Sequence, residues 1–403
     1  MFESVTETVS AFVGTALGGP PPRGLPKLHP VARLSPRVVR VLGGNPGAFT
    51  LQGTNAYLIG TGHRRWLLDT GEGRPAFAAN LRSAMEREGV TELEGILLTH
   101  WHRDHVGGVA DARKVARDAR LASLDAPRGG VREDIEPLVA YKKVRLDKAE
   151  RAIDLDSLFS DELPVRHAAR REASKRRVYA DVKNGDVFSV PGATLRALYT
   201  PGHTEDHMCF FLEEEGAIFA GDCVLNGNTA VFENLSSYSR SLETMRAELS
   251  AAARKKHFTR SGSGERAEID PALLGRLYPS HGDVIRDGAR KLEQYARHRE
   301  TREGMFMDAL VRDWRLKPER GGVTKRELTR LVYGDAGVSA LVLFTACARI
   351  AAEHLGKLVE EGRVIREERK WAFVPATIVS LMPFFFAETR YRPSPAEMAA
   401  AAR

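Results

Sequence analysis

Four potential metal ligands fall within six residues of the segment Thr99–Gly108, which reads Thr-His-Trp-His-Arg-Asp-His-Val-Gly-Gly. They are His100, His102, Asp104 and His105. Imidazole and carboxylate groups are the side chains with which proteins bind zinc and related divalent ions, and one loop can direct two of them at each of two ions. The alternative is a polar surface loop with three coincidental histidines. The dense H-x-H-x-D-H order, followed by two glycines, favours a metal site.

Side chains of the same kinds follow other short apolar runs, at the points where predicted strands end. They are Asp69, His203, Asp222 and His281. Because sheets gather functional side chains on the loops after their strands, we expect these residues and the segment 99–108 to form one site. Two adjacent dications in that site would lower the pKa of a bridging water and supply hydroxide near neutral pH, so no nucleophilic side chain is required.

The chain around these residues alternates between strand and helix patterns. Runs rich in branched aliphatic and aromatic residues predict strands at 38–42, 56–60, 66–71, 95–98, 193–199, 208–212 and 217–220. Helices are predicted from about Arg74 to Glu88 and from Gly108 to about Arg120. The order of strand, helix, strand and ligand loop predicts an α/β fold.

Length and composition predict one large domain and a smaller one, because 403 residues exceed what a single hydrophobic core organises. Lys and Arg total 60 against 53 Asp and Glu, a net charge of +7. That excess favours an anionic partner, although a solvated basic surface explains it equally well. The three cysteines, Cys209, Cys223 and Cys347, lack C-x-x-C spacing, which indicates a reducing compartment.

Import and membrane signals are not apparent. The N-terminus carries Glu3 and Glu7 before its first Arg and lacks the regions of a secretory signal. The uncharged run 371–387 contains two prolines and is shorter than the ~20 residues that a spanning helix needs. We expect a cytoplasmic protein without stable membrane insertion, with the mitochondrial matrix as the alternative compartment. The oligomeric state cannot be predicted.

Composition divides the chain into four segments. Residues 1–35, with Gly-Gly-Pro-Pro-Pro, predict a flexible arm, and residues 36–304 hold all the candidate ligands. Residues 305–374 predict a small helical unit with a capping box at Thr324–Glu327, closed by a hairpin of 363–365 and 371–374 in a winged-helix-like order. Residues 375–403 are expected to form a tail.

The segment 127–177 is polar and contains a strongly basic stretch at 166–177. Such a cluster could contact phosphates. It has no interleaved aromatic side chain for base stacking, so a solvated helical face is the favoured interpretation.

Together these motifs resemble the metallo-β-lactamase superfamily. Its five motifs are matched by Asp69, by His100, His102, Asp104 and His105, and by His203, Asp222 and His281. The segments 39–73, 200–212 and 230–235 are further similar to the beta-lactamase-like protein 2 family, which includes a mitochondrial endoribonuclease and fungal thioesterases that release polyketides from acyl carrier proteins. The resemblance implies an αββα sandwich with a small C-terminal winged-helix-like domain.

The resemblance also implies a division of the ligands between two ions. One would take His100, His102 and His203, and the other Asp104, His105 and His281, with Asp222 bridging. Nitrogen-rich ligation favours two Zn²⁺ per chain, although Mn²⁺ or Fe could occupy the same cage.

Roles beyond the ligands follow from the same pattern. Asp104, Asp222 and His207 are the candidate catalytic residues. His207 would protonate a leaving group or merely bond to the backbone, and the second role is slightly favoured. Asp69 is expected to hold the ligating histidines by hydrogen bonds. Thr54 and Asn55 are candidate substrate contacts. Ser280 stands where the family usually has glycine before the last histidine, a tolerable change because Ser is small.

Three functions remain open on the sequence alone. The leading hypothesis is a dinuclear metal-dependent hydrolase that uses a metal-bridging hydroxide to cut single-stranded RNA. The alternative is a thioesterase acting on acyl carrier protein or other acyl thioesters. The third is a nucleic-acid-binding protein without catalysis, which the complete ligand set disfavours. A metal-bound hydroxide attacks either ester, so the ligands cannot choose between the two substrates.

Overall fold

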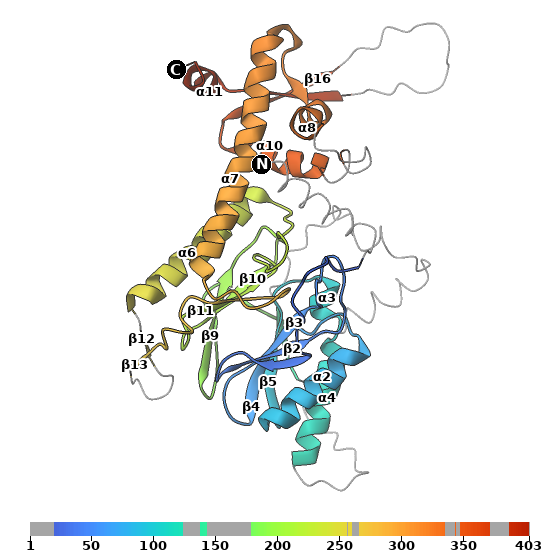
Figure 1. The fold of residues 1–403 in the computed structure, drawn as a ribbon, viewed down its shortest axis with the longest axis vertical. Helices are drawn as coiled ribbons and strands as arrows, with labels where there is room; N and C mark the ends of the chain where they lie inside the picture. The colour runs from blue at the N-terminus through green and yellow to red at the C-terminus, as the bar shows by residue number, and fades with distance from the viewer. Residues whose placement is uncertain are drawn as a thin grey trace, which may run out of the picture.

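The computed structural model describes residues 20–123, 138–142, 179–255, 257–259, 266–334, 343, 347–370 and 387–402. Within these residues, two β-sheets lie face to face with helices on their outer sides, and one long helix leads to a smaller unit (Figure 1). The order of helix, sheet, sheet and helix confirms the predicted αββα sandwich. We call this part the sandwich and the smaller part the C-terminal unit.

The first sheet holds the N-terminal half of the sandwich. Its strands, in spatial order, are β1 (Val31–Arg33), β2 (Val38–Leu42), β3 (Asn55–Ile59), β4 (Arg64–Leu68), β5 (Glu92–Leu97), β6 (Ala140–Lys142) and β7 (Tyr179–Asp181). The strands from β1 to β4 pair antiparallel and those from β4 to β7 pair parallel. Helix α2 (Pro75–Glu88) connects β4 to β5, and α4 (Val109–Ser123) packs beside it. The short helix α3 (Arg103–Val106) lies between β5 and α4.

The second sheet has five strands. In spatial order they are β14 (Leu277–Pro279), β11 (Ala217–Gly221), β10 (Met208–Leu212), β9 (Ala193–Tyr199) and β8 (Val187–Val190). Helices α6 (Leu235–Lys255) and α7 (Gly288–Leu316) cover its outer face, where Tyr238, Leu242 and Leu292 are buried. A separate two-stranded ribbon joins β12 (His257–Thr259) to β13 (Arg266–Glu268).

Every residue of β10 is buried, because both faces of its sheet are covered. Met208, Phe210 and Leu212 face the core between the sheets, while Cys209 and Phe211 face the helical layer of α6 and α7. This alternation is the period of two that a strand requires. The core therefore has three layers, and the rigid central layer fixes the strand ends that carry the ligands.

The C-terminal unit packs around the end of α7, at the top of Figure 1. It contains a 3₁₀ turn η2 (Pro318–Arg320), β15 (Val323–Thr324), α8 (Lys325–Tyr333), α10 (Ala348–Glu360), β16 (Val364–Lys370), β17 (Ala387–Pro393) and α11 (Pro395–Ala400). The predicted capping box is present, because the Thr324 hydroxyl accepts from the Glu327 amide and the Glu327 carboxylate accepts from the Thr324 amide. Its strands lie in the order β15, β17, β16. The winged-helix-like assignment stays a prediction.

Predicted segment boundaries differ from the observed elements in three places. Strand β1 lies inside the predicted flexible arm 1–35, because it pairs with β2 over three residues. The boundary between 304 and 305 falls inside α7, which both parts share. Residues 387–393, expected in the tail 375–403, pair with β16 over seven residues and form the central strand of that sheet. The predicted partner strand 371–374 and the basic stretch 166–177 lie outside the described residues.

Among the helices that the structure describes, none combines the length and apolar character needed to cross a membrane.

Candidate metal centre

The predicted ligands meet at one edge of the sandwich because of strand direction. His203 lies on the turn after β9, Asp222 directly follows β11 and His281 follows β14. Strand β10 runs antiparallel to β9 and β11, and β14 runs parallel to β11, so these three strands end at the same edge. The segment after β5 reaches this edge from the other sheet, where the Met208 amide donates to the Thr99 carbonyl over 2.8 Å.

Three imidazole nitrogens form the first ligand group. His100 Nε2 lies 2.8 Å from His102 Nδ1, and His203 Nε2 lies 3.2 Å from the first and 3.0 Å from the second. Nitrogens held about 2.0–2.1 Å from one tetrahedral zinc stand about 3.3 Å apart, so three atoms at these separations can share an ion.

The second group combines one carboxylate with two imidazoles. Asp104 Oδ2 lies 3.2 Å from His105 Nε2 and 3.2 Å from His281 Nε2. Asp222 stands between the groups: its Oδ1 lies 3.6 Å from His105 Nε2 and 3.3 Å from His281 Nε2, and its Oδ2 lies 3.7 Å from His203 Nε2. The structure thus brings all seven predicted ligands together, in the division that the resemblance implies.

Orphaned polar atoms at this centre indicate that a cation belongs there. Among the residues that the structure describes, His105 Nε2 and Asp222 Oδ1 are buried without a hydrogen-bond partner. A buried polar group without a partner costs about 1–3 kcal/mol, more when it is charged, so native structures rarely keep several in one place. A pair of divalent ions would satisfy both atoms, and the nitrogen and oxygen donor set fits zinc, manganese or iron.

Burial and neighbouring charges set the protonation of the ligands. Burial lowers the pKa of His100 well below its usual value, and it lowers the pKa of His203 to about 3. Burial alone would raise the pKa of Asp104 and Asp222, but the adjacent His105 and His281 hold both carboxyl groups well below the usual range. Near neutral pH His100 and His203 are therefore neutral and both carboxylates are charged, the states that a metal requires. Although burial lowers the pKa of His105 and His281, the neighbouring carboxylates outweigh it and raise the pKa of His105 well above its usual value and that of His281 to about 9, so a cation that binds them displaces a proton from each.

Asp69 holds the ligand loop from behind. Its Oδ2 lies 2.8 Å from His105 Nδ1, and its Oδ1 accepts from the Thr99 amide over 2.9 Å. The Thr99 hydroxyl lies 3.0 Å from both Asp69 Oδ2 and His100 Nδ1, so it joins His100 to the same carboxylate that holds His105. Thr99 was missed at the sequence level; a hydroxyl residue directly before a histidine at a strand end is the signal that could have identified it.

Thr54 and Asn55, predicted as substrate contacts, are fully buried beside the ligands. The Thr54 hydroxyl accepts from Asn45 Nδ2 and lies 3.4 Å from Asp104 Oδ2. The Asn55 amide group donates to the carbonyls of Pro279 and Gly282 over 2.8 and 2.7 Å, on either side of His281. These contacts hold the ligand loops, and substrate contact by either residue stays a prediction.

His207 is held by the backbone instead of facing a substrate. Its Nε2 accepts from the Asp222 amide over 3.1 Å, which leaves the proton on Nδ1, where the Thr200 hydroxyl lies 3.0 Å away. The ring is fully buried, and a Cβ added to Gly221 would lie 2.4 Å from Nε2. The geometry therefore favours the backbone role over protonation of a leaving group.

Comparisons with known proteins extend these observations. Residues 49–264 match the sequence profile described as the Metallo-beta-lactamase superfamily. The chain is 34% identical over 381 residues to the lactamase-like protein nscB of Aspergillus fumigatus, covering 92% of this chain and 90% of that protein. It is 36% identical over 354 residues to the lactamase-like protein vrtG of Penicillium aethiopicum, covering 86% and 91%.

Solved structures with the same fold include two bacterial proteins. A beta-lactamase domain protein from Burkholderia ambifaria aligns with a TM-score of 0.54 at 17% identity, covering 92% of this chain and 97% of that chain. A metallo-beta-lactamase family protein from Thermus thermophilus aligns with a TM-score of 0.51 at 20% identity, covering 90% and 100%.

Proposed function

The chain belongs to the metallo-beta-lactamase superfamily, and on that premise we propose that it hydrolyses acyl thioesters with two divalent metal ions held at the centre described above. The observation that carries the proposal is the position of Asp222, with one oxygen toward each ligand group. His100, His102 and His203 would hold one ion, and Asp104, His105 and His281 the other. Zinc is the proposed metal, with manganese or iron as competitors.

Two bound ions supply an activated water at neutral pH and stabilise the charge that develops on the attacked oxygen. The protein contributes orientation. Asp69 and Thr99 fix the ring nitrogens of His100 and His105 that face away from the ligand groups, so the ligating atoms need no reorganisation. The three core layers exclude water from behind the centre, which strengthens electrostatic interactions within it.

The leaving group separates the two candidate substrates. A phosphodiester or oxygen ester releases an alkoxide, which needs a proton in the transition state, whereas a thiol has a pKa of about 8.5 and departs as thiolate. His207 is the residue that the sequence suggested as proton donor, but its Nε2 already accepts a hydrogen bond from the Asp222 amide. A site without that donor is better suited to a thioester.

The relatives support the same choice. Both fungal lactamase-like proteins match this chain over more than four fifths of its length, and the family resemblance drawn from the sequence includes fungal thioesterases that act on acyl carrier proteins. We place the acyl thioester first for these two reasons.

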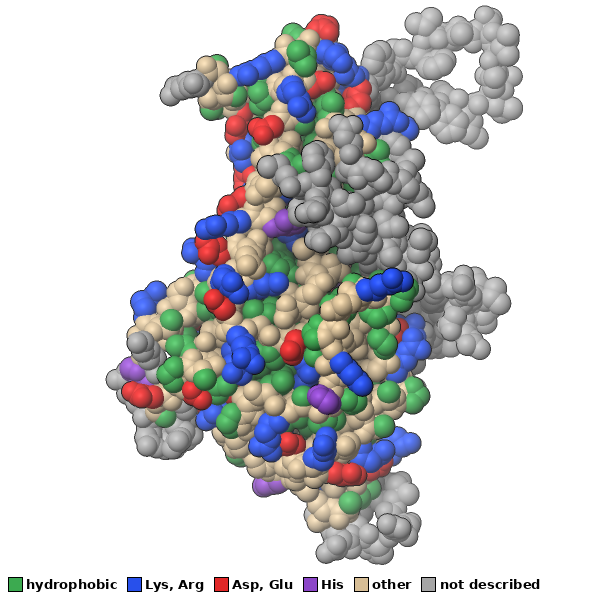
Figure 2. All heavy atoms as spheres, viewed as in Figure 1, with side chains coloured by type: hydrophobic (Ala, Val, Ile, Leu, Met, Phe, Trp, Pro, Cys, Tyr) green, Lys and Arg blue, Asp and Glu red, His purple; other side chains and the backbone are tan. Residues whose placement is uncertain are grey.

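Single-stranded RNA remains the second candidate because of the net charge of +7. On the face shown in Figure 2, Lys and Arg side chains of the described residues are mixed with Asp and Glu and form no continuous basic band. Binding of single-stranded RNA typically needs such a band together with aromatic stacking platforms.

Parallel turnover assays decide between the candidates. Purified protein loaded with Zn²⁺, Mn²⁺ or Fe²⁺ is given an acyl-pantetheine thioester, the matched oxygen ester and a panel of single-stranded RNAs, with His203→Ala as the blank. We expect thioester cleavage that exceeds the blank by at least about 100-fold, slower cleavage of the oxygen ester and intact RNA. RNA cleavage that depends on His203, with the thioester left intact, would reverse the order of the two proposals.

A further inference from the structure

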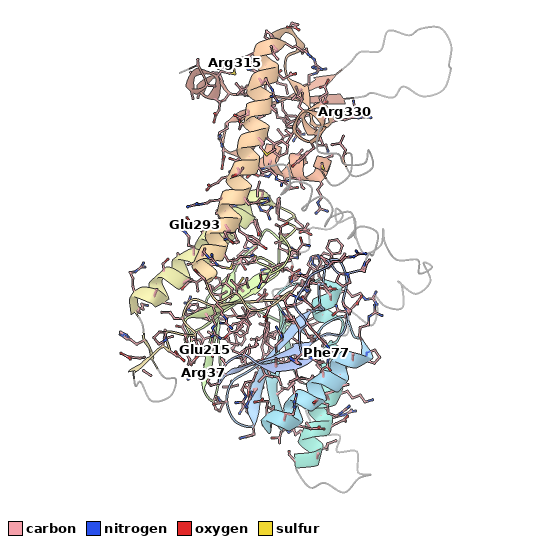
Figure 3. The ribbon with its side chains drawn as sticks, in the orientation of Figure 1. Arg37, Phe77, Glu215, Glu293, Arg315 and Arg330 are labelled. Atoms are coloured by element: carbon pink, nitrogen blue, oxygen red, sulfur yellow. The ribbon has the colours of Figure 1, made fainter. Side chains whose placement is uncertain are left out.

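Helix α7 carries two buried arginines, three residues apart, near the middle of its course from the sandwich to the C-terminal unit. Figure 3 labels Glu293 on the sandwich side of α7 and Arg315 near its far end. Between them, Arg299 is 8% exposed and Arg302 is 3% exposed. Arginine is almost never buried without a partner. In the part of the chain that the structure describes, neither guanidinium forms an ion pair with a carboxylate, so other groups must hold them.

Arg299 is held by a carbonyl and three aromatic rings. Its Nη2 donates to the Ala230 carbonyl over 2.9 Å. Its guanidinium carbon lies 4.8 Å from the ring centre of Phe232, 5.5 Å from that of Tyr238 and 6.0 Å from that of Tyr295. Aromatic faces attract a guanidinium and leave the N–H groups at its edge free to donate hydrogen bonds, so the positive charge is stabilised without a carboxylate partner.

The segment that Arg299 holds is the one that fixes His203. The Val231 carbonyl lies 2.7 Å from His203 Nδ1, so it accepts the proton that leaves Nε2 free for a metal. The amides of Glu233 and Asn234 donate to the Gly202 carbonyl over 2.7 and 3.1 Å. Arg299 thus contacts the residues directly before and directly after Val231, and a shift of this segment would turn the His203 ring.

The same aromatic group supports the loop of Asp222. The Tyr238 hydroxyl donates to the Cys223 carbonyl over 2.6 Å. The Tyr295 hydroxyl accepts from the Leu225 amide over 3.1 Å and donates to the Asn228 carbonyl over 2.8 Å. Two loops that carry metal ligands therefore rest on the rings around Arg299.

Packing leaves this group little freedom. A Cβ added to Gly202 would lie 2.3 Å from the Tyr238 amide nitrogen and 2.6 Å from its Cβ, so the turn that carries His203 is in close contact with α6. Gly202 has a φ of +132°, which glycine adopts far more readily than other residues. A displacement of Tyr238 must therefore move His203.

We propose that Arg299 is a positioning residue for the metal centre: it clamps the segment 230–232 and the rings of Tyr238 and Tyr295, and thereby sets the orientation of His203 and the path of the Asp222 loop. This inference rests on the metal centre of the proposed function and is independent of the substrate. The alternative is that Arg299 only fills the core and stabilises α7.

Arg302 provides a matched control for that alternative. It is buried on the same helix, its Nη1 donates to the Tyr333 hydroxyl over 3.1 Å, and its guanidinium carbon lies 5.7 Å from the Tyr333 ring centre. Its hydrogen bonds run to Tyr333 of the C-terminal unit and to His298 on α7 itself, and within the described residues none reaches the ligand loops. Removal of either guanidinium should cost global stability, but only loss of Arg299 should disturb the ligands.

The test compares Arg299→Met, Arg299→Lys and Arg302→Met in the full-length protein. Metal affinity is measured by competition with a chromophoric chelator, the ligand field by the visible spectrum of the Co²⁺-substituted protein, and global stability by thermal unfolding without metal. We expect Arg299→Met to weaken binding of one ion about tenfold and to shift the Co²⁺ spectrum. Arg299→Lys should restore most of the affinity, because it keeps a cation over Phe232 and one donor for Ala230.

Arg302→Met should lower the unfolding temperature as Arg299→Met does, yet change metal affinity by less than twofold. The positioning role would be refuted if Arg299→Met and Arg302→Met both bound metal as tightly as the wild type. It would also be refuted if both variants lost the same amount of metal affinity. If Arg299→Met does not fold, Tyr238→Phe decides, because it removes the hydroxyl that holds the Cys223 carbonyl, and a wild-type Co²⁺ spectrum in that variant refutes the role. A wild-type protein that binds fewer than two ions would refute the metal centre itself, whereas two bound ions without thioester turnover would refute only the substrate.

Discussion

Replacement of Asp69 by asparagine tests whether the centre depends on hydrogen bonds behind its ligands. Asp69 is buried, accepts from the Thr99 amide over 2.9 Å and lies 2.8 Å from His105 Nδ1. His105 presents Nε2 to the ligand group. Its proton is therefore on Nδ1, which donates a hydrogen bond to Asp69 Oδ2. Both oxygens of Asp69 therefore face N–H donors, and an amide in either orientation places its NH₂ group against one of them.

The magnitude follows from the lost interaction. A hydrogen bond to a charged group contributes about 1.5–3 kcal/mol, which corresponds to roughly 10- to 150-fold in an equilibrium constant. Groups that orient metal ligands have similar effects, about 10- to 100-fold in metal affinity. The backbone should not move, because Asp69 has a φ of +57° and asparagine adopts that conformation as readily as aspartate.

The assay is zinc affinity of Asp69→Asn by chelator competition, together with thioester turnover. Glu215→Gln is the matched control, because Glu215 is also a buried carboxylate, with the hydroxyl oxygens of Ser35 and Tyr278 2.5 and 2.6 Å away. Glu215, labelled in Figure 3, lies on the turn between β10 and β11. The ligand Asp222 lies at the opposite end of β11. Wild-type zinc affinity in Asp69→Asn, or an equal loss in Glu215→Gln, would show that the orienting bond does not control the centre.

Four further changes test other parts of the structure. His102→Ala should reduce bound zinc from two ions to one and lower turnover by at least about 100-fold, as measured by metal analysis and thioester assay. Gly108→Ala should abolish metal binding, because the added Cβ would lie 2.0 Å from the Thr70 carbonyl oxygen. Gly304→Ala, where a Cβ on α7 meets open space, should instead raise the free energy of unfolding in urea by about 0.5–1 kcal/mol. Phe77→Ala should cost about 3–5 kcal/mol in the same assay, because this side chain is fully buried between α2 and the first sheet, and Phe49→Ala, half exposed, should cost little. Burial and the cations of Arg299 and Arg302 lower the pKa of His354 to about 3, below its value of about 6.5 in the unfolded chain. The contribution of neutral His354 to the free energy of unfolding is therefore fully present above pH 6.5 and is lost as the pH falls toward 3. Acidification from pH 7 to 5 should therefore remove about 2 kcal/mol through His354 alone, and the loss measured by urea unfolding should be smaller by about that amount in His354→Leu.

The ligand set could be predicted from the sequence because each ligand stands at a strand end marked by a short apolar run. His100, His203, Asp222 and His281 are far apart in the chain, yet parallel and antiparallel pairing brings the ends of β9, β11 and β14 to one edge. The direction of the strands thus converts a pattern along the sequence into a cluster in space.

The roles of the surrounding polar residues could not be predicted, because each role depends on the hydrogen-bond partner that the folded chain brings to each side-chain atom. His207 has the residue type of an acid catalyst, but the Asp222 amide reaches its Nε2 through the tight turn at Gly221. Thr54 and Asn55 lie beside the site as expected, yet their polar atoms are directed at loop carbonyls or neighbouring side chains. Such pairings arise between separate segments of the chain, where local patterns carry no information.

The C-terminal sheet shows a related limit. Strand β16 alternates apolar and charged residues only weakly, and its partner β17 follows 16 residues after it ends. A short hairpin was the simpler expectation, since close strands usually pair with their neighbours. The observed register pairs Val364 with Pro393 and Lys370 with Ala387, a long-range pairing that the sequence of either strand does not encode.

The nitrogens that face away from the ligand groups explain how the fold and the metal centre depend on each other. His105 Nδ1 is held by Asp69, His100 Nδ1 lies against the Thr99 hydroxyl, and His203 Nδ1 is held by the Val231 carbonyl. Asp69 and Thr99 follow the neighbouring strands β4 and β5 of the first sheet, and Val231 lies in the segment that α7 holds through Arg299 and Ala230, so the supports come from two layers of the sandwich. Because each support fixes one tautomer, the ligating nitrogens can face a metal without reorganisation only when these layers are packed. The helix that joins the C-terminal unit to the sandwich therefore belongs to the structure that defines the metal centre, although it supplies no ligand.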